Sequence, residues 1–133
     1  MSVQRVLIIE DEVSSREALE SLLIEEGYSV RTASTGLAGL DSYRDFHPNT
    51  VVCDYHLPDI DGLHVLRAIR EHDESDVRII MVTAGLSGEA AERELRAEAD
   101  AFLGKPIDLD QLTHALRAHG ASPGGGEFLN ALS

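Results

Sequence analysis

Apolar residues along this chain follow two alternating patterns. Short apolar runs predict β-strands, and longer segments with apolar residues every three or four positions predict α-helices. The strand-like runs cover residues 6–9, 29–33, 50–53, 78–82 and 101–103, and the helical segments cover 14–26, 37–46, 63–72, 89–99 and 109–119. Three of the runs are apolar almost throughout, which is typical of parallel strands covered by helices on both faces. The alternation predicts an α/β fold, a doubly wound parallel (βα)₅ sheet.

The ends of the first helical segment carry local signals. Ser14 and Glu17 have the spacing of a capping box, and Gly27 stands where a helix would stop. The residues expected to face the core from the first and last helices are Ala18, Leu19, Leu22 and Leu23, and Leu109, Leu112 and Leu116.

The length of 133 residues suits one domain, which we expect to span residues 1–120. From Ala121 the chain reads Ser-Pro-Gly-Gly-Gly, so residues 121–133 predict a flexible tail. This tail is either the start of a linker or residues left over from cloning. No secretory signal or membrane-spanning run is visible, so we expect a cytoplasmic protein without a membrane partner.

The formal net charge of −13 argues against direct nucleic-acid binding, which depends on clustered Lys and Arg. Lys105 is the single lysine beside ten arginines. Either an ammonium is needed at that position, or the composition is biased and one lysine remains by chance. The one cysteine, Cys53, lies inside an apolar run and is interpreted as a small buried residue.

Polar residues follow four of the five predicted strands. Glu10 and Asp11 follow the first strand, Asp54 the third, Thr83 the fourth and Lys105 the fifth. The carboxyl ends of such strands form the ligand-binding edge of the sheet. Three carboxylates at one edge repel one another, which makes sense around a hard cation such as Mg²⁺. One carboxylate can then attack phosphorus, while a hydroxyl and an ammonium bind phosphoryl oxygens.

Each of these residues also has an ordinary structural interpretation. Asp54 can be a turn or helix cap, and Glu10 with Asp11 can be an acidic start to the first helix. Thr83 can be a turn residue, and Lys105 can be solvated surface. The combination on four strand ends is what favours phosphoryl chemistry.

Four stretches of sequence form a recognisable set. They are Val-Leu-Ile-Ile-Glu-Asp-Glu at 6–12, Asp-Tyr-His-Leu-Pro-Asp-Ile-Asp-Gly at 54–62, Val-Thr-Ala at 82–84 and Phe-Leu-Gly-Lys-Pro at 102–106. In this order and spacing the sequence resembles the response-regulator receiver domains of two-component signalling, over about residues 4–119. The resemblance implies a flavodoxin-like fold with strand order 2-1-3-4-5.

The resemblance also implies how the carboxylates are used. Asp54 matches the residue that accepts a phosphoryl group from a histidine kinase or phosphotransfer protein. Asp11 matches a direct Mg²⁺ ligand, and Glu10 matches an acid that acts through water. The backbone carbonyl of His56 matches a further protein ligand of Mg²⁺.

The remaining matched residues belong to the phosphoryl site and the switch. Thr83 and Lys105 match the groups that bind phosphoryl oxygens, and Phe102 matches the aromatic residue that changes position with Thr83. A cis Lys105–Pro106 bond is implied as well, and X–Pro bonds adopt the cis form at little cost.

The implied function is phosphorelay signal transduction by a two-state switch. Phosphorylation would change the face built from the segments 89–99, 101–103 and 109–119 and so signal to a downstream protein or output domain. A homodimer on phosphorylation is one form of output, although Ile107 stands where such dimers usually carry Phe. The domain would be no enzyme beyond promoting its own phosphorylation and dephosphorylation.

Two other classes of function stay open on the sequence alone. A receiver-like interaction module that works without phosphorylation usually lacks the site residues, which are present here. A phosphatase acting through an aspartyl phosphate would need a second Asp two positions after Asp54, where this chain has His56. The His56 ring is either simply exposed or tunes the lifetime of the phosphoryl group.

Overall fold

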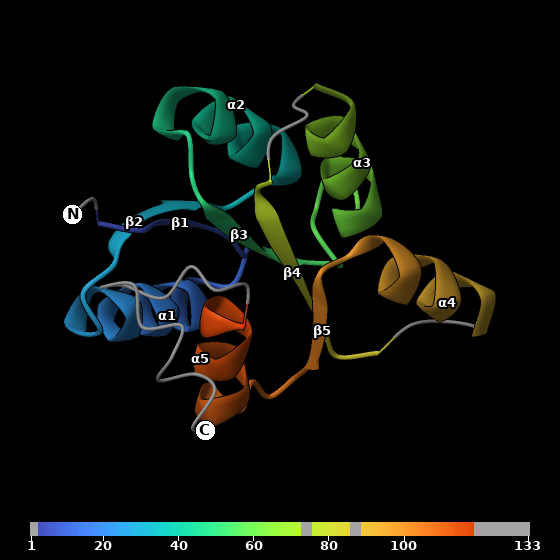
Figure 1. The fold of residues 1–133 in the computed structure, drawn as a ribbon. Helices are drawn as coiled ribbons and strands as arrows, with labels where there is room; N and C mark the ends of the chain where they lie inside the picture. Colours follow the sequence, from blue (N-terminus) through green and yellow to red (C-terminus); the bar gives the residue numbers. More distant parts are fainter. Residues whose placement is uncertain (1–2, 73–75, 86–88, 119–133) are drawn as a thin grey trace.

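The computed structural model describes residues 3–72, 76–85 and 89–118. Five parallel strands form one sheet in the order β2-β1-β3-β4-β5 (Figure 1). The strands are β1 (Arg5–Ile9), β2 (Ser29–Ala33), β3 (Thr50–Asp54), β4 (Arg78–Thr83) and β5 (Ala101–Gly104). The predicted parallel sheet and its strand order are therefore confirmed.

Five helices connect and cover these strands. They are α1 (Val13–Glu25), α2 (Gly36–Phe46), α3 (Gly62–His72), α4 (Glu89–Glu98) and α5 (Leu109–Arg117). Figure 1 shows α1 and α5 on one face of the sheet and α2, α3 and α4 on the other. Predicted and observed boundaries agree within one residue, apart from the end of the last helix. Its predicted end at residue 119 and the predicted tail at 121–133 lie outside the described residues.

The core consists of two apolar layers, one on each face of the sheet. Along β1, Leu7 and Ile9 pack into the layer beneath α2, α3 and α4, while Val6 and Ile8 pack into the layer beneath α1 and α5. Successive side chains of a strand point to opposite faces, so a central strand with both faces covered must be apolar at every position. This explains the uninterrupted apolar runs of β1, β3 and β4.

The start of α1 differs from the prediction. The helix begins at Val13 after the N-cap Glu12, whose side chain makes no capping hydrogen bond, so the predicted Ser14 cap is wrong. The Glu10 carboxylate accepts a hydrogen bond from the Glu12 N–H at 3.0 Å, and the Ser15 hydroxyl donates to the Glu12 carboxylate. These contacts form the turn that enters the helix. Gly27, with φ of 100°, ends α1 as predicted.

Two residues expected in the core face solvent instead. Leu19 and Leu23 of α1 are buried, but Ala18 is exposed and Leu109 of α5 is 50% exposed. The exposed pair borders a shallow groove of about 220 Å³, here called the α1–α5 groove. Its lining is Ser15, Ala18, Leu19, Lys105, Pro106, Ile107 and Leu109. The apolar stripe of each helix is thus wider than the surface that the sheet covers.

The start of α3 lies very close to the end of β3. A Cβ atom added to Gly62 would be 2.8 Å from the Asp54 carbonyl oxygen and 2.8 Å from the Tyr55 Cα. The Gly62 N–H donates to the Tyr55 carbonyl at 2.8 Å. Only glycine allows this approach, which fixes the loop that follows Asp54.

Helix α4 has few apolar contacts. Among its described side chains only Leu95 is buried. Charged contacts with α3 supplement it, because Arg67 donates to Glu94 at 3.2 Å and to Glu98 at 2.6 Å. No helix within the described ranges combines the length and the apolar character needed to cross a membrane.

Candidate functional site

The candidate site lies at the carboxyl edge of the sheet, where the strand order reverses between β1 and β3. The chain leaves β1 toward one side to form β2 and returns to form β3 on the other side, and Ile9 pairs with Cys53 in the register of the two strands. Glu10 and Asp54 therefore lie at adjacent strand ends. This is the position at which doubly wound sheets bind ligands.

Three carboxylates meet at this edge. One oxygen atom of each of Glu10, Asp11 and Asp54 lies within 4.8 Å of the others. Glu10 and Asp54 are only 3% and 5% exposed, and Asp11 is exposed. Like charges this close, with two of them removed from water, need a cation to balance them.

Lys105 supplies one positive charge. Its ammonium donates to Asp54 Oδ2 at 2.7 Å and to Glu10 Oε1 at 2.9 Å. Burial alone would lower the pKa of Lys105, but the hydrogen bonds and charges of Asp54 and Glu10 outweigh burial and raise the pKa above its ordinary value. The side chain thus stays an ammonium at neutral pH.

The backbone of Lys105 is held by the neighbouring strand. Its N–H donates to the Thr83 carbonyl at 3.0 Å, which continues the β4–β5 pairing by one residue. The Lys105–Pro106 peptide bond is cis. The sheet itself therefore directs the lysine side chain across the ends of β4 and β3 toward Glu10.

Thr83 ends β4 and is buried, with 3% of its surface exposed. Its hydroxyl donates to the Gly85 carbonyl at 3.0 Å and accepts from the Gly85 N–H at 3.1 Å. The His56 ring contacts the same carbonyl, with Nε2 at 2.8 Å. The structure therefore brings Thr83 to the site edge but pairs its hydroxyl with its own loop.

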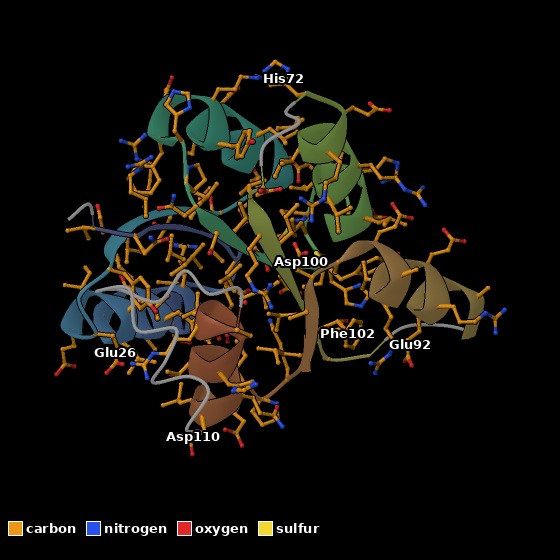
Figure 2. The ribbon with its side chains drawn as sticks, in the orientation of Figure 1. Glu26, His72, Glu92, Asp100, Phe102 and Asp110 are labelled. Atoms are coloured by element: carbon orange, nitrogen blue, oxygen red, sulfur yellow. The ribbon has the colours of Figure 1, made fainter. Side chains whose placement is uncertain are left out.

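Phe102 lies apart from the carboxylates, on the side of the domain formed by β5 and α4 (Figure 2). It is partly buried against the core, and the Arg96 guanidinium lies 4.4 Å from the centroid of its ring. Such a cation–π contact holds one ring face. The aromatic residue is thus on the surface that the sequence predicted for signalling.

One contact that positions the site was not predicted. The Asp59 carboxylate accepts hydrogen bonds from the Gly36 and Leu37 N–H groups at the start of α2, both at 2.8 Å. The hydrogen bond from Leu37 is the largest cause that lowers the pKa of Asp59 to about 2, and the bond from Gly36 adds to it. The loop after Asp54 is thereby anchored to α2. No local sequence pattern marks such a contact between residues 23 positions apart.

The donor set suits a hard divalent cation. Glu10, Asp11 and Asp54 offer carboxylate oxygens, which Mg²⁺ and Ca²⁺ prefer. The ammonium of Lys105 balances only one of the three negative charges. The acidic cluster is therefore able to hold a metal ion, with the exposed Asp11 leaving one side open to water.

The sequence profile described as "Response regulator receiver domain" matches residues 6–117. The chain belongs to this family. The family assignment makes it a part of two-component systems, whose response regulators interact with histidine kinases and with downstream outputs.

Full-length relatives of the receiver domain are longer than this chain. This chain is 33% identical over 111 residues to regulatory protein AtoC of Escherichia coli K12, and the match covers 84% of this chain and 24% of AtoC. It is 37% identical over 118 residues to response regulator MprA of Mycobacterium bovis, covering 89% of this chain and 50% of MprA. The chain thus spans from about a quarter to half of the length of these relatives.

Solved structures agree with the fold. The receiver domain is similar to a CheY-like receiver protein from Methanospirillum hungatei, with a TM-score of 0.81, 30% identity and coverage of 89% of this chain and 94% of that one. It is also similar to TrrA from Thermotoga maritima, solved in complex with Mg²⁺-BeF, with a TM-score of 0.77, 31% identity and coverage of 87% and 98%.

The Asp59 anchor makes stability depend on pH. Its pKa is lowered to about 2 in the folded domain, so its contribution is complete above the ordinary value of 3.8 and is lost as the pH falls toward 2. We expect Asp59→Ala to lower the free energy of unfolding at pH 6, and we expect this difference to shrink between pH 4 and about 2. Urea unfolding over that range measures it, with the exposed α2 residue Asp45 changed to Ala as control. A difference between wild type and Asp59→Ala that does not vary with pH would contradict the assignment.

Proposed function

We propose that this receiver domain accepts a phosphoryl group on Asp54 from a histidine kinase or phosphotransfer protein in a Mg²⁺-dependent reaction. The observation that carries the proposal is the environment of Asp54. It is a buried carboxylate at the sheet edge, bonded to an ammonium and grouped with two further acids. A plain turn or cap residue would need none of these neighbours.

The chain's own residues account for the transfer as follows. A carboxylate oxygen of Asp54 forms a bond to phosphorus while the bond from phosphorus to the donor's imidazole nitrogen breaks, and that nitrogen keeps the electron pair and takes up a proton. Lys105, already bonded to Asp54, turns to a phosphoryl oxygen. The Thr83 hydroxyl binds another after leaving Gly85. Hydrolysis later returns the carboxylate and inorganic phosphate.

Glu10, Asp11, Asp54 and the backbone carbonyl of His56 would hold the Mg²⁺ ion. The ion would supply charge neutralisation between the carboxylates and the incoming phosphoryl group. The similar TrrA was solved in complex with Mg²⁺-BeF, which supports this choice of metal. The backbone N–H of His56 donates to Asp54 Oδ1 at 3.2 Å, so this part of the loop is already directed at the acceptor.

The α1–α5 groove suits the proposed phosphodonor. Lys105 is part of its lining, and Val13 and Leu109, which are 55% and 50% exposed, lie on its two helices. An exposed apolar surface beside a reactive site favours docking of a protein. We assign this groove to docking of the phosphodonor. The contact would take place in the cytoplasm, where ATP is available to phosphorylate a histidine kinase. The strong negative charge of the chain argues against nucleic acid as a direct partner.

We further propose that the signal leaves through the face of α4, β5 and α5. The support is the link from Asp54 through Lys105 to β5, the position of Phe102 under Arg96, and the small apolar attachment of α4. A downstream protein, an output domain or a second copy of the domain would read this face. The domain would act on no substrate other than its own phosphoryl group. The alternative is a module that binds partners without phosphorylation.

Phosphorylation is tested by intact-mass analysis after incubation with acetyl phosphate and Mg²⁺. We expect one phosphoryl adduct on wild type, none on Asp54→Ala, and none on wild type in EDTA, because the acceptor and the metal are both required. Asp45→Ala, a change of an exposed carboxylate on α2, should retain the adduct. Absence of the adduct from wild type would make the phosphorylation-independent module the better account.

Lys105 also affects metal affinity. Because its ammonium occupies oxygens of Asp54 and Glu10, we expect Lys105→Met to bind Mg²⁺ more tightly, by roughly tenfold given the energy of nearby unit charges, and to accept phosphoryl more slowly. Calorimetric Mg²⁺ titration measures the affinity. Arg44→Met removes the same charge from an exposed α2 pair and should leave it unchanged. Equal or weaker binding by Lys105→Met would show that the ammonium does not compete with the metal.

The signalling face is tested by hydrogen exchange with and without the phosphoryl group. We expect phosphorylation to change amide exchange in α4 and β5, because movement of Thr83 alters the space beside Phe102. In Thr83→Ala the adduct should form while this distant change is lost. A response limited to the loops around Asp54, or one that persists in Thr83→Ala, would rule out this route.

A further inference from the structure

The Gly85 carbonyl is the shared acceptor of two side chains, one from the end of β4 and one from the loop after β3. The Thr83 hydroxyl donates to it at 3.0 Å, and His56 Nε2 lies 2.8 Å from it. A carbonyl can only accept, so the ring nitrogen is the donor and carries the hydrogen. A carbonyl oxygen has two lone pairs, and these two donors use both.

The His56 ring is held in this position although it is exposed. Its backbone N–H donates to Asp54 Oδ1 at 3.2 Å. The Tyr55 ring packs edge-on against it, with centroids 5.0 Å apart and planes at 87°. The Tyr55 hydroxyl in turn donates to Asp61 at 3.4 Å. An exposed histidine without such contacts would be free to rotate.

These contacts connect the loop after Asp54 to the loop after Thr83. His56 follows Asp54 by two residues, and Gly85 follows Thr83 by two residues. The hydroxyl of Thr83 both donates to and accepts from Gly85, so the position of this glycine decides where the hydroxyl points. Among the described residues, no atom lies within 4 Å of the position that a Cβ atom added to Gly85 would take, so that side of the glycine has no packing contact with them.

We propose that the His56 imidazole is a positioning residue that holds the Thr83 hydroxyl in the arrangement of the unphosphorylated domain. It acts through the Gly85 carbonyl and touches neither the hydroxyl nor the phosphoryl group in doing so. The inference rests on the proposed role of Thr83. For Thr83 to reach a phosphoryl group on Asp54, it must give up its bonds to Gly85. The ring keeps Gly85 in place and so favours the unphosphorylated arrangement.

The expected size of this effect on Thr83 follows from the strength of the hydrogen bond between His56 and Gly85. A single hydrogen bond shifts an equilibrium by roughly two- to tenfold, and an exposed one belongs at the lower end of that range. We expect removal of the ring to change the balance of the two Thr83 arrangements by about two- to fivefold. His56→Leu removes the donor, and His56→Gln keeps an N–H at a similar reach.

The first experiment needs no phosphorylation. The exchange rate of the Gly85 amide, which donates to the Thr83 hydroxyl, is measured by NMR in wild type and in both His56 variants. We expect His56→Leu to exchange about two- to fivefold faster and His56→Gln to match wild type. An unchanged rate in His56→Leu, or equal rates in the two variants, would overturn the proposal.

The second experiment asks whether His56 acts through Thr83. The rate of phosphorylation by acetyl phosphate is measured for wild type, His56→Leu, Thr83→Ala and the double variant. We expect His56→Leu to raise the rate about two- to fivefold when Thr83 is present and to have no effect in Thr83→Ala. An equal effect in both backgrounds would mean that the ring acts directly at the site, contrary to the proposal. If wild type accepts no phosphoryl group, the proposed function fails, and the amide exchange still decides the role of His56.

Discussion

The bridge from Lys105 to Asp54 and Glu10 is the interaction on which the rest of the site depends. It places one ammonium between two carboxylates that are almost fully buried, at 2.7 and 2.9 Å. Without a cation these acids would repel each other in a region that water scarcely reaches, and burial of unpaired charge is costly. The bridge therefore places a positive charge beside the buried Asp54 carboxylate at the end of β3.

The same bridge connects elements that are far apart in sequence. Lys105 continues the pairing of β5 with β4 through the Thr83 carbonyl, so hydrogen bonds connect Asp54 to two neighbouring strand ends. His56 and Gly85 add a link between the loops that follow β3 and β4. A phosphoryl group arriving at Asp54 would thus meet a set of hydrogen bonds that must be exchanged together, which is a physical basis for two discrete states.

The grouping of the candidate site residues could be predicted because it depends on topology. Parallel strands place their carboxyl ends at one edge, so Glu10, Asp54 and Lys105 had to meet once the strands were recognised. The helix ends were predicted where one residue decides them, as Gly27 does for α1. The Ser14 cap was wrong because Glu10, a residue of the site, also takes part in the turn before α1 and moves the helix start.

Contacts between loops could not be predicted from the sequence for a different reason. The bond from His56 to Gly85 and the anchoring of Asp59 on α2 depend on loop conformations and side-chain rotamers, which have no periodic pattern. Leu109 looked like a core residue because its spacing fits the buried stripe of α5. The buried stripe of α5 begins one turn later, and Leu109 borders the α1–α5 groove instead.

The small number of buried contacts made by the described residues of α4 has an evolutionary consequence. Leu95 is the one buried side chain among its described residues, and the other described positions of the helix contribute little to the core. Substitutions on this surface can therefore accumulate with small effects on folding. On the proposed role of this face in signalling, a lineage could exchange one recognition partner for another by changing α4 alone, while the sheet and the acidic edge stay under separate constraint. The residues of the acidic edge and the exposed residues of α4 can therefore change independently of one another.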